Sequence, residues 1–84
     1  MPHITMYSSN TCPYCVQAQA LFDRKGVTVN KIMIDQTPLE LTNMIERTGR
    51  RTVPQIFIGE TYVGGFTDLH KLEQAGQLDQ LLQP

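Results

Sequence analysis

The chain has 84 residues, which is enough for one domain and too few for two. Hydrophobic residues make up 40% of it and charged residues 18%, as in ordinary soluble globular proteins. The formal net charge of -1 argues against nucleic-acid binding, and the longest apolar runs are too short to span a membrane. We therefore expect a single domain over residues 1–84 with neither nucleic acid nor membrane as a partner.

The first half of the chain predicts a strand, a helix and a second strand. Ile4 and Met6 alternate with Thr5 and Tyr7, so apolar residues face one side of the first strand. The helix that follows has apolar residues on one face and is ended by Gly26. The predicted ranges are 3–8 for the first strand, 15–25 for the helix and 29–35 for the second strand.

The second half predicts a helix, a hairpin and closing helical turns. Thr37 suits the N-cap of the helix, with Pro38 at its first position, Glu40 completing a capping box and Gly49 ending it. Thr67 is the expected cap of the last long helix. The two hairpin strands are predicted at 55–59 and 61–65, and further helical turns at 78–82.

The predicted order of elements is therefore β-α-β-α-β-β-α. The first strand, helix and second strand form a right-handed crossover, which makes the two strands parallel. The hairpin adds two antiparallel strands, and the helices can cover both faces of the resulting sheet. We expect an α/β fold with a four-stranded mixed sheet flanked by helices.

Cys12 and Cys15 are the only cysteines of the chain, and they flank Pro13 and Tyr14 where the first helix is about to begin. If Cys12 directly precedes the helix, unpaired N–H groups and the helix dipole point at its sulfur and lower its pKa. A thiolate is the nucleophile of disulfide exchange, and Cys15 lies close enough to attack a mixed disulfide on Cys12. Pro13 fixes the backbone at the helix start, and Tyr14 offers a ring to an incoming peptide.

Three other uses of the two thiols have to be weighed. A zinc site needs four ligands, and His3 and His70 do not stand at a spacing that completes one. A cluster shared between two chains would use one thiolate from each chain. A purely structural disulfide would close a loop of four residues, which stabilises a fold little. Redox exchange is the favoured interpretation of the pair.

Three motifs extend this interpretation over the chain: CPYC at 12–15, TVPQIFI at 52–58 and GGFTD at 64–68. Together they resemble the glutaredoxin family, specifically the small bacterial dithiol glutaredoxins, and the resemblance covers nearly the whole chain. It implies a thioredoxin fold and an enzyme with no bound cofactor and no metal, which uses glutathione as its reducing co-substrate.

The resemblance also implies roles for individual residues. Cys12 would be the attacking thiol and Cys15 the resolving one. Pro54 would follow a cis peptide bond and expose the main chain of Val53, where glutathione could pair as an added strand. Asp68 at the last helix start could bind the γ-glutamyl end. The implied glutathione-binding residues are Tyr14, Arg51, Thr52, Val53, Pro54, Gly65, Thr67 and Asp68.

The chain departs from the family pattern at Ser9. Many glutaredoxins have a lysine three residues before the first active-site cysteine, where this chain has serine. Such a cation would help to lower the pKa of the thiolate and would bind the glycyl carboxylate of glutathione. Arg51, or with less support Arg50, could take the second role, since arginine suits bidentate carboxylate binding.

The resulting prediction is a glutathione-dependent oxidoreductase that reduces protein–glutathione mixed disulfides and protein disulfides. Its partners would be glutathione and disulfide-bearing or glutathionylated proteins, and we expect a monomer. The N-terminal stretch lacks the regions of a signal peptide, so we expect a cytoplasmic protein. One alternative is a thioredoxin-like electron donor reduced by a flavoprotein. Another is an iron–sulfur cluster carrier, which Pro13 disfavours because it stiffens the loop.

Overall fold

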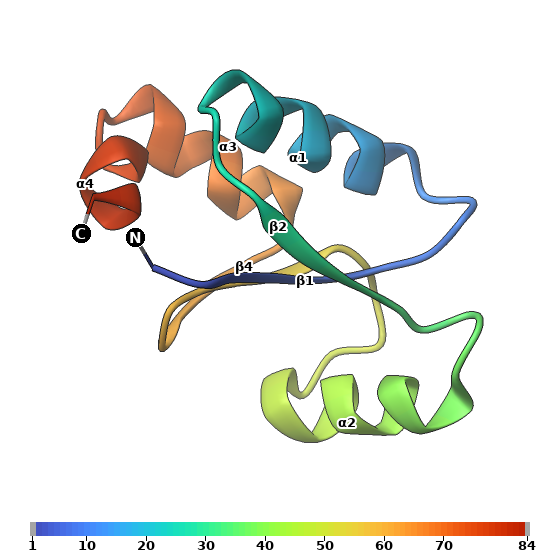
Figure 1. Ribbon diagram of the computed structural model, residues 1–84. Helices are drawn as coiled ribbons and strands as arrows, with labels where there is room; N and C mark the ends of the chain where they lie inside the picture. Colours follow the sequence, from blue (N-terminus) through green and yellow to red (C-terminus); the bar gives the residue numbers. More distant parts are fainter. Residues whose placement is uncertain (1, 84) are drawn as a thin grey trace.

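A computed structural model describes residues 2–83 of the chain, and Figure 1 shows its helices on both sides of one sheet. The predicted order β-α-β-α-β-β-α is confirmed, with a short further helix at the end. The elements are β1 (Ile4–Ser8), α1 (Pro13–Arg24), β2 (Val29–Met33), α2 (Pro38–Thr48), β3 (Gln55–Ile58), β4 (Thr61–Gly64), α3 (Phe66–Gln74) and α4 (Leu78–Leu82). No helix within the described range is both long enough and apolar enough to cross a membrane.

The sheet has the strand order β2-β1-β3-β4, so β1 and β3 are its two central strands. β1 runs parallel to β2 and antiparallel to β3, and β3 runs antiparallel to β4. In the register of the central pair, Ile4 faces Ile58 and Tyr7 faces Gln55. The end of β1 therefore lies beside the start of β3. This topology brings the loop that carries the cysteines next to the segment that precedes β3.

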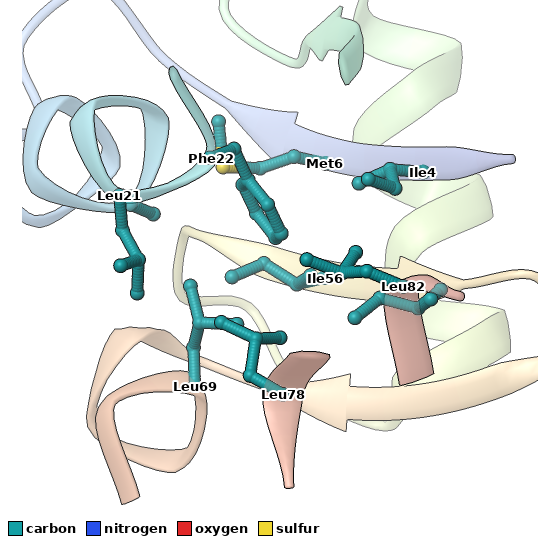
Figure 2. Close-up of a cluster of buried hydrophobic side chains, with 10 residues drawn as sticks. Ile4, Met6, Leu21, Phe22, Ile56, Leu69, Leu78 and Leu82 are labelled. Atoms are coloured by element: carbon teal, nitrogen blue, oxygen red, sulfur yellow. The ribbon is translucent and has the colours of Figure 1, made fainter. Parts of the chain in front are cut away.

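The larger core cluster lies between the sheet and the layer formed by α1, α3 and α4 (Figures 1 and 2). The alternation predicted for β1 is confirmed, because Ile4 and Met6 both point into this cluster. Phe22 of α1 packs in its middle and has no exposed surface. The ten buried members are Ile4, Met6, Ala18, Leu21, Phe22, Ile56, Ile58, Leu69, Leu78 and Leu82.

Ion pairs join the three helices of this layer at its edge. The Lys25 ammonium, next to the end of α1, lies 2.8 Å from a carboxylate oxygen of Glu73 in α3. It lies at the same distance from a carboxylate oxygen of Asp79 in α4. Hydrogen bonds to Asp79 and then to Glu73 raise the pKa of Lys25 above its ordinary value. One cation therefore connects the end of α1 with α3 and α4.

A smaller cluster lies on the opposite face, under α2. Its buried members are Tyr7, Met44 and Phe57. Arg47 of α2 covers the two rings: its Nη1 donates to the Tyr7 hydroxyl at 3.0 Å, and its guanidinium carbon lies 4.0 Å from the centre of the Phe57 ring. A cation over an aromatic ring is a favourable contact. The helix is thus attached by few side chains, one of them charged.

The capping box predicted for α2 is wrong, although Thr37 is the N-cap residue and Pro38 begins the helix. The Thr37 side chain makes no capping hydrogen bond. The N–H of Glu40 donates instead to the main-chain carbonyl of Thr37 at 2.9 Å, and the Glu40 carboxylate accepts from the Asn43 amide at 2.6 Å. Local main-chain and side-chain partners therefore replace the expected reciprocal pair. Gly49 ends the helix in a left-handed conformation, as predicted.

The cap predicted for the last long helix is also wrong. The N-cap of α3 is Gly65, and Thr67 lies within the first turn. The Asp68 carboxylate accepts from the Gly65 N–H at 3.0 Å and so performs the capping. This carboxylate occupies the space where a side chain on Gly64 would begin, and the φ of Gly64 is 114°. A glycine is therefore required at position 64 for α3 to begin in this way.

Candidate active site

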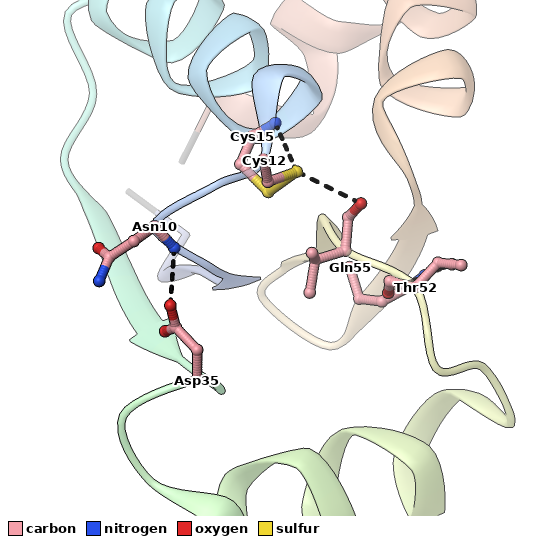
Figure 3. The surroundings of a disulfide bond; sticks show 7 residues. Asn10, Cys12, Cys15, Asp35, Thr52 and Gln55 are labelled. Carbon is pink, nitrogen blue, oxygen red and sulfur yellow. Dashed lines mark hydrogen bonds between the residues drawn. A yellow bond between two sulfur atoms is a disulfide. The ribbon is translucent and has the colours of Figure 1, made fainter.

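The two cysteines lie at the start of α1, which begins two residues earlier than predicted. Cys12 is the N-cap residue with an extended backbone, and Pro13 occupies the first helical turn. The sulfurs are joined as a disulfide (Figure 3). The main-chain N–H of Cys15 donates to Sγ of Cys12 at 3.2 Å. The prediction that helix N–H groups point at this sulfur is therefore confirmed for the N–H of Cys15. Such a donor favours the thiolate form of Cys12 in the reduced protein.

The two sulfurs differ in their access to solvent. Cys12 is half-buried, whereas Cys15 is 3% exposed and lies among the buried residues of α1. A thiolate must reach the disulfide of a substrate before it can exchange with it. The geometry therefore suits Cys12 as the thiol that attacks from outside. Cys15 can then act from inside, on a disulfide already formed at Cys12.

The loop between β1 and α1 is fixed by a contact with the end of β2. The main-chain N–H of Asn10 donates to the Asp35 carboxylate at 3.0 Å, as Figure 3 shows. Both residues are exposed. This hydrogen bond holds Asn10, two residues before Cys12, next to the segment that follows β2.

The segment before β3 forms the opposite side of the site. The peptide bond between Val53 and Pro54 is cis, as the resemblance implied. The carbonyl oxygen of Val53 lies 3.5 Å from Sγ of Cys12. In the reduced protein the Cys12 thiol can donate to this oxygen. The main chain at Val53 is thus in direct contact with the reactive sulfur.

A pocket of about 230 Å³ opens beside the dithiol. It brings together seven of the eight residues predicted to bind glutathione, from α1, from the segment before β3 and from the start of α3. These seven are Tyr14, Thr52, Val53, Pro54, Gly65, Thr67 and Asp68. Three further residues complete the lining, namely Arg50, Gln55 and Phe66.

The arginine at the pocket is Arg50, and Arg51 is not among its lining residues. Nη1 of Arg50 lies 3.9 Å from Oδ2 of Asp68, so the pocket has a cationic and an anionic side chain at one end. Both side chains keep about half of their surface exposed, so water screens this pair. The two neighbouring arginines are placed differently: Arg50 lines the pocket, and Arg51, which the sequence favoured, does not.

Aromatic rings form the rim on the side of the helices. Tyr14 is 59% exposed, and its ring is stacked 6.0 Å from that of Phe66 at the start of α3. The ring of His70, one helical turn later, is also stacked with that of Phe66, and the two ring centres lie 5.7 Å apart. Phe66 also packs against the larger core cluster. Phe66 therefore contributes both to the packing of the core and to the lining of the pocket.

Gln55 is a pocket residue that the sequence could have indicated. It is a polar side chain at the start of the apolar strand QIFI, and it is 1% exposed. A buried amide in such a strand indicates hydrogen bonds that the strand alone does not need. Arg50 was the second candidate for binding a carboxylate, after Arg51, whereas Phe66 carried no comparable signal because apolar residues at helix starts are common.

Comparisons with known proteins agree with this geometry. A family model described as Glutaredoxin matches residues 4–63. A glutaredoxin of Neisseria meningitidis is 49% identical over 85 residues, which cover 100% of both chains. The solution structure of a glutaredoxin from Brucella melitensis is 49% identical with a TM-score of 0.86, and the match covers 98% of this chain and 89% of that one.

A crystal structure of a buckwheat glutaredoxin–glutathione complex is more distant in sequence. It is 30% identical with a TM-score of 0.89, and the match covers 96% of this chain and 76% of that one. The fold of the present chain, with its mixed four-stranded sheet and flanking helices, is therefore the thioredoxin fold. The cysteine pair at the helix start, the adjacent pocket and the family match together place this chain in the glutaredoxin family.

Proposed function

We propose that this chain uses glutathione to reduce protein–glutathione mixed disulfides, with the pocket beside Cys12 as the glutathione site. As a glutaredoxin it is a thiol–disulfide oxidoreductase, and the cysteine pair is its redox centre. One observation carries the proposal: Val53 lines the pocket, and its carbonyl oxygen lies 3.5 Å from Sγ of Cys12. The reactive sulfur is therefore next to the pocket.

The chemistry of the pocket matches that of glutathione, a short peptide with charged ends. The main chain at Val53 can pair with the cysteinyl residue of glutathione in the manner of an added strand. The carboxylate of Asp68 and the N–H groups at the start of α3 can receive the γ-glutamyl ammonium and carboxylate. Arg50 can bind a carboxylate at the same pocket. The glutathione complex of the buckwheat protein supports this assignment.

The reaction begins when the Cys12 thiolate attacks the glutathione sulfur of a mixed disulfide. The bond between the protein sulfur and glutathione breaks, a bond between Cys12 and glutathione forms, and the protein thiolate leaves and is protonated. The thiolate of a second glutathione then attacks the glutathione on Cys12. Glutathione disulfide is released and the Cys12 thiolate is regenerated. One reduced glutathione is therefore consumed for each protein thiol restored, and the other half of the glutathione disulfide comes from the substrate.

The buried thiol of Cys15 gives a second route. It can attack the sulfur of Cys12 when Cys12 is joined to a substrate, which releases the substrate thiolate and forms the bond between Cys12 and Cys15. Two glutathione molecules then reduce this bond by two exchanges. With a protein disulfide as substrate, this route releases both protein thiols. We propose disulfide-bearing and glutathionylated proteins as substrates, and a monomer in the cytoplasm as the working form.

The assay is reduction of a small mixed disulfide of glutathione, with glutathione as the reductant and its oxidation followed by a coupled enzyme. Cys12→Ser should abolish the activity, because a hydroxyl is far less acidic than a thiol and forms no mixed disulfide. Cys15→Ser should keep a substantial part of it and lose most reduction of protein disulfides. An active Cys12→Ser protein together with an inactive Cys15→Ser protein would reverse the assigned roles.

A parallel assay distinguishes the alternative electron donor. The same protein is supplied with a flavoprotein disulfide reductase and its nicotinamide reductant in place of glutathione. The proposal expects turnover with glutathione and little with the flavoprotein. Turnover with the flavoprotein alone would contradict the proposed use of glutathione, although the chemistry of the cysteines would be the same.

A further inference from the structure

Gln55 combines complete burial with a position at the pocket. It is the first residue of β3, directly after Pro54, and its side chain is 1% exposed. The three residues that follow are buried and apolar: Ile56, Phe57 and Ile58. Burying an amide is unfavourable unless its polar atoms find partners. The partners of this amide therefore indicate what it does.

Both ends of the Gln55 amide are used. Its Nε2 donates to the carbonyl of Thr52 at 2.9 Å and to the hydroxyl of the same residue at 3.2 Å. Its Oε1 accepts from the hydroxyl of Tyr62 in β4. The orientation of the amide is fixed, because the Thr52 carbonyl can only accept. The donor end thus holds the segment before β3, and the acceptor end is held by the neighbouring strand.

These contacts end at the wall of the active site. Thr52 is exposed and lies outside any strand or helix, and its carbonyl belongs to the peptide unit that leads into Val53. The next carbonyl, that of Val53, faces Sγ of Cys12 at 3.5 Å. On the other side, the Tyr62 ring packs 5.1 Å from the ring of Phe57. A chain of contacts therefore runs from the sheet through Gln55 to the carbonyl beside the reactive sulfur.

We propose that Gln55 is a positioning residue, which fixes the main chain of Thr52 and Val53 in the geometry that receives glutathione. This inference rests on the proposed function of the pocket. An apolar side chain of the same size would fill the space and leave the Thr52 carbonyl without this donor. A glutamate would place a negative oxygen against that carbonyl. Only the neutral amide supplies donors toward Thr52 and an acceptor toward Tyr62 together.

The test uses Gln55→Met, which keeps the volume of the side chain and removes its hydrogen bonds. The KM for the small glutathione mixed disulfide should rise about tenfold, while kcat changes little. The matched control is Ile58→Val, a buried change in the same strand whose side chain belongs to the larger core cluster. Its KM should stay unchanged, and both variants are compared at equal fractions of folded protein.

A second variant keeps the test decisive if Gln55→Met does not fold. Tyr62→Phe removes only the hydroxyl that holds the acceptor end, at a residue that is 38% exposed. Its KM should rise by about threefold, with the same pattern in kcat. If Gln55→Met folds, an unchanged KM in that variant would overturn the positioning role. If it does not fold, an unchanged KM in Tyr62→Phe would overturn that role, and in both cases the proposed function stands. A wild-type protein without glutathione-dependent turnover would overturn both.

Discussion

The sheet face covered by α1, α3 and α4 carries a buried cluster of ten side chains, whereas the face under α2 carries three among the described residues. The dithiol belongs to the first face, because Cys15 is a buried residue of α1. The arginine and the main chain that line the pocket belong to the segment joining α2 to β3. The two halves of the site are therefore supported by very different amounts of packing.

This inequality separates two properties of the protein. Free energy of unfolding depends on buried apolar area, and most of that area lies on the face of α1, α3 and α4. The pocket wall before β3 depends on α2 and on the buried amide of Gln55. We expect changes to buried residues of the first face that do not line the pocket to lower stability without altering glutathione binding, and changes under α2 to alter both.

The strongest test compares one buried side chain from each face. Leu78→Ala in α4 and Met44→Ala in α2 remove side chains with no exposed surface. Each should lower the free energy of unfolding by about 2–5 kcal/mol, measured by urea denaturation. Only Met44→Ala should raise the KM for a glutathione mixed disulfide, because it loosens the helix that leads into the pocket wall.

The two enzymes are assayed at a temperature where both remain folded, so that lost protein is not mistaken for lost affinity. Leu78→Val serves as a milder control on the first face. Equal rises in KM for Leu78→Ala and Met44→Ala would show that the two faces support the pocket alike, and the separation would be wrong.

The parts of the fold that the sequence predicted are those set by periodicity. Ile4 and Met6 alternate with Tyr7, and the two sets do enter different clusters. The caps were missed because several groups compete for the same N–H. At α3 the carboxylate of Asp68 prevails over the hydroxyl of Thr67, and only glycine at position 64 makes room for it. No pattern of residues reveals such a competition.

The placement of the candidate site residues was predicted where a motif fixed the backbone, and less well between motifs. Cys12, Pro54 and Asp68 come together because each stands at the start of a helix or strand whose position the topology determines. The choice between Arg50 and Arg51 depends on irregular backbone, where neighbouring side chains have no fixed relation. Gln55 could have been found from the sequence by asking why an amide precedes three apolar residues.

A second test changes the charge at the pocket and little of the packing. Asp68→Ala removes both the cap of α3 and a carboxylate at the pocket. A charged hydrogen bond to a ligand contributes roughly 1.5–3 kcal/mol, so the KM for glutathione should rise by about 10- to 150-fold. The loss of the cap should lower the free energy of unfolding by about 0.5–2 kcal/mol. Steady-state kinetics and urea denaturation measure the two effects.

Asp68→Asn is the matched control, since its amide oxygen can still accept from the Gly65 N–H while the charge is gone. We expect it to keep most of the stability and to lose most of the affinity. If Asp68→Asn binds glutathione as well as the wild type does, the carboxylate acts on the helix alone and has no part in the pocket.

The smallest effect is expected from a charge added on the α1 side. Arg50 brings a positive charge to the pocket from the α2 side, whereas Ser9, Asn10 and Thr11 bring none from the loop before Cys12. Ser9→Lys should lower the pKa of Cys12, because an opposite charge within about 4–6 Å favours the ionised form. The site is open to water, so we expect about one pKa unit, the low end of the range.

Thiolate absorbance in the far ultraviolet, followed against pH at low and high salt, measures this change. The shift should shrink as salt rises, because exposed charges are screened within about 8 Å at physiological ionic strength. The turnover rate should rise by less than the larger fraction of thiolate suggests, since a thiol with a lower pKa gives a weaker nucleophile. Ser9→Gln adds length without charge and should leave the titration unchanged. Identical curves for Ser9→Lys and Ser9→Gln would mean that position 9 does not face the sulfur.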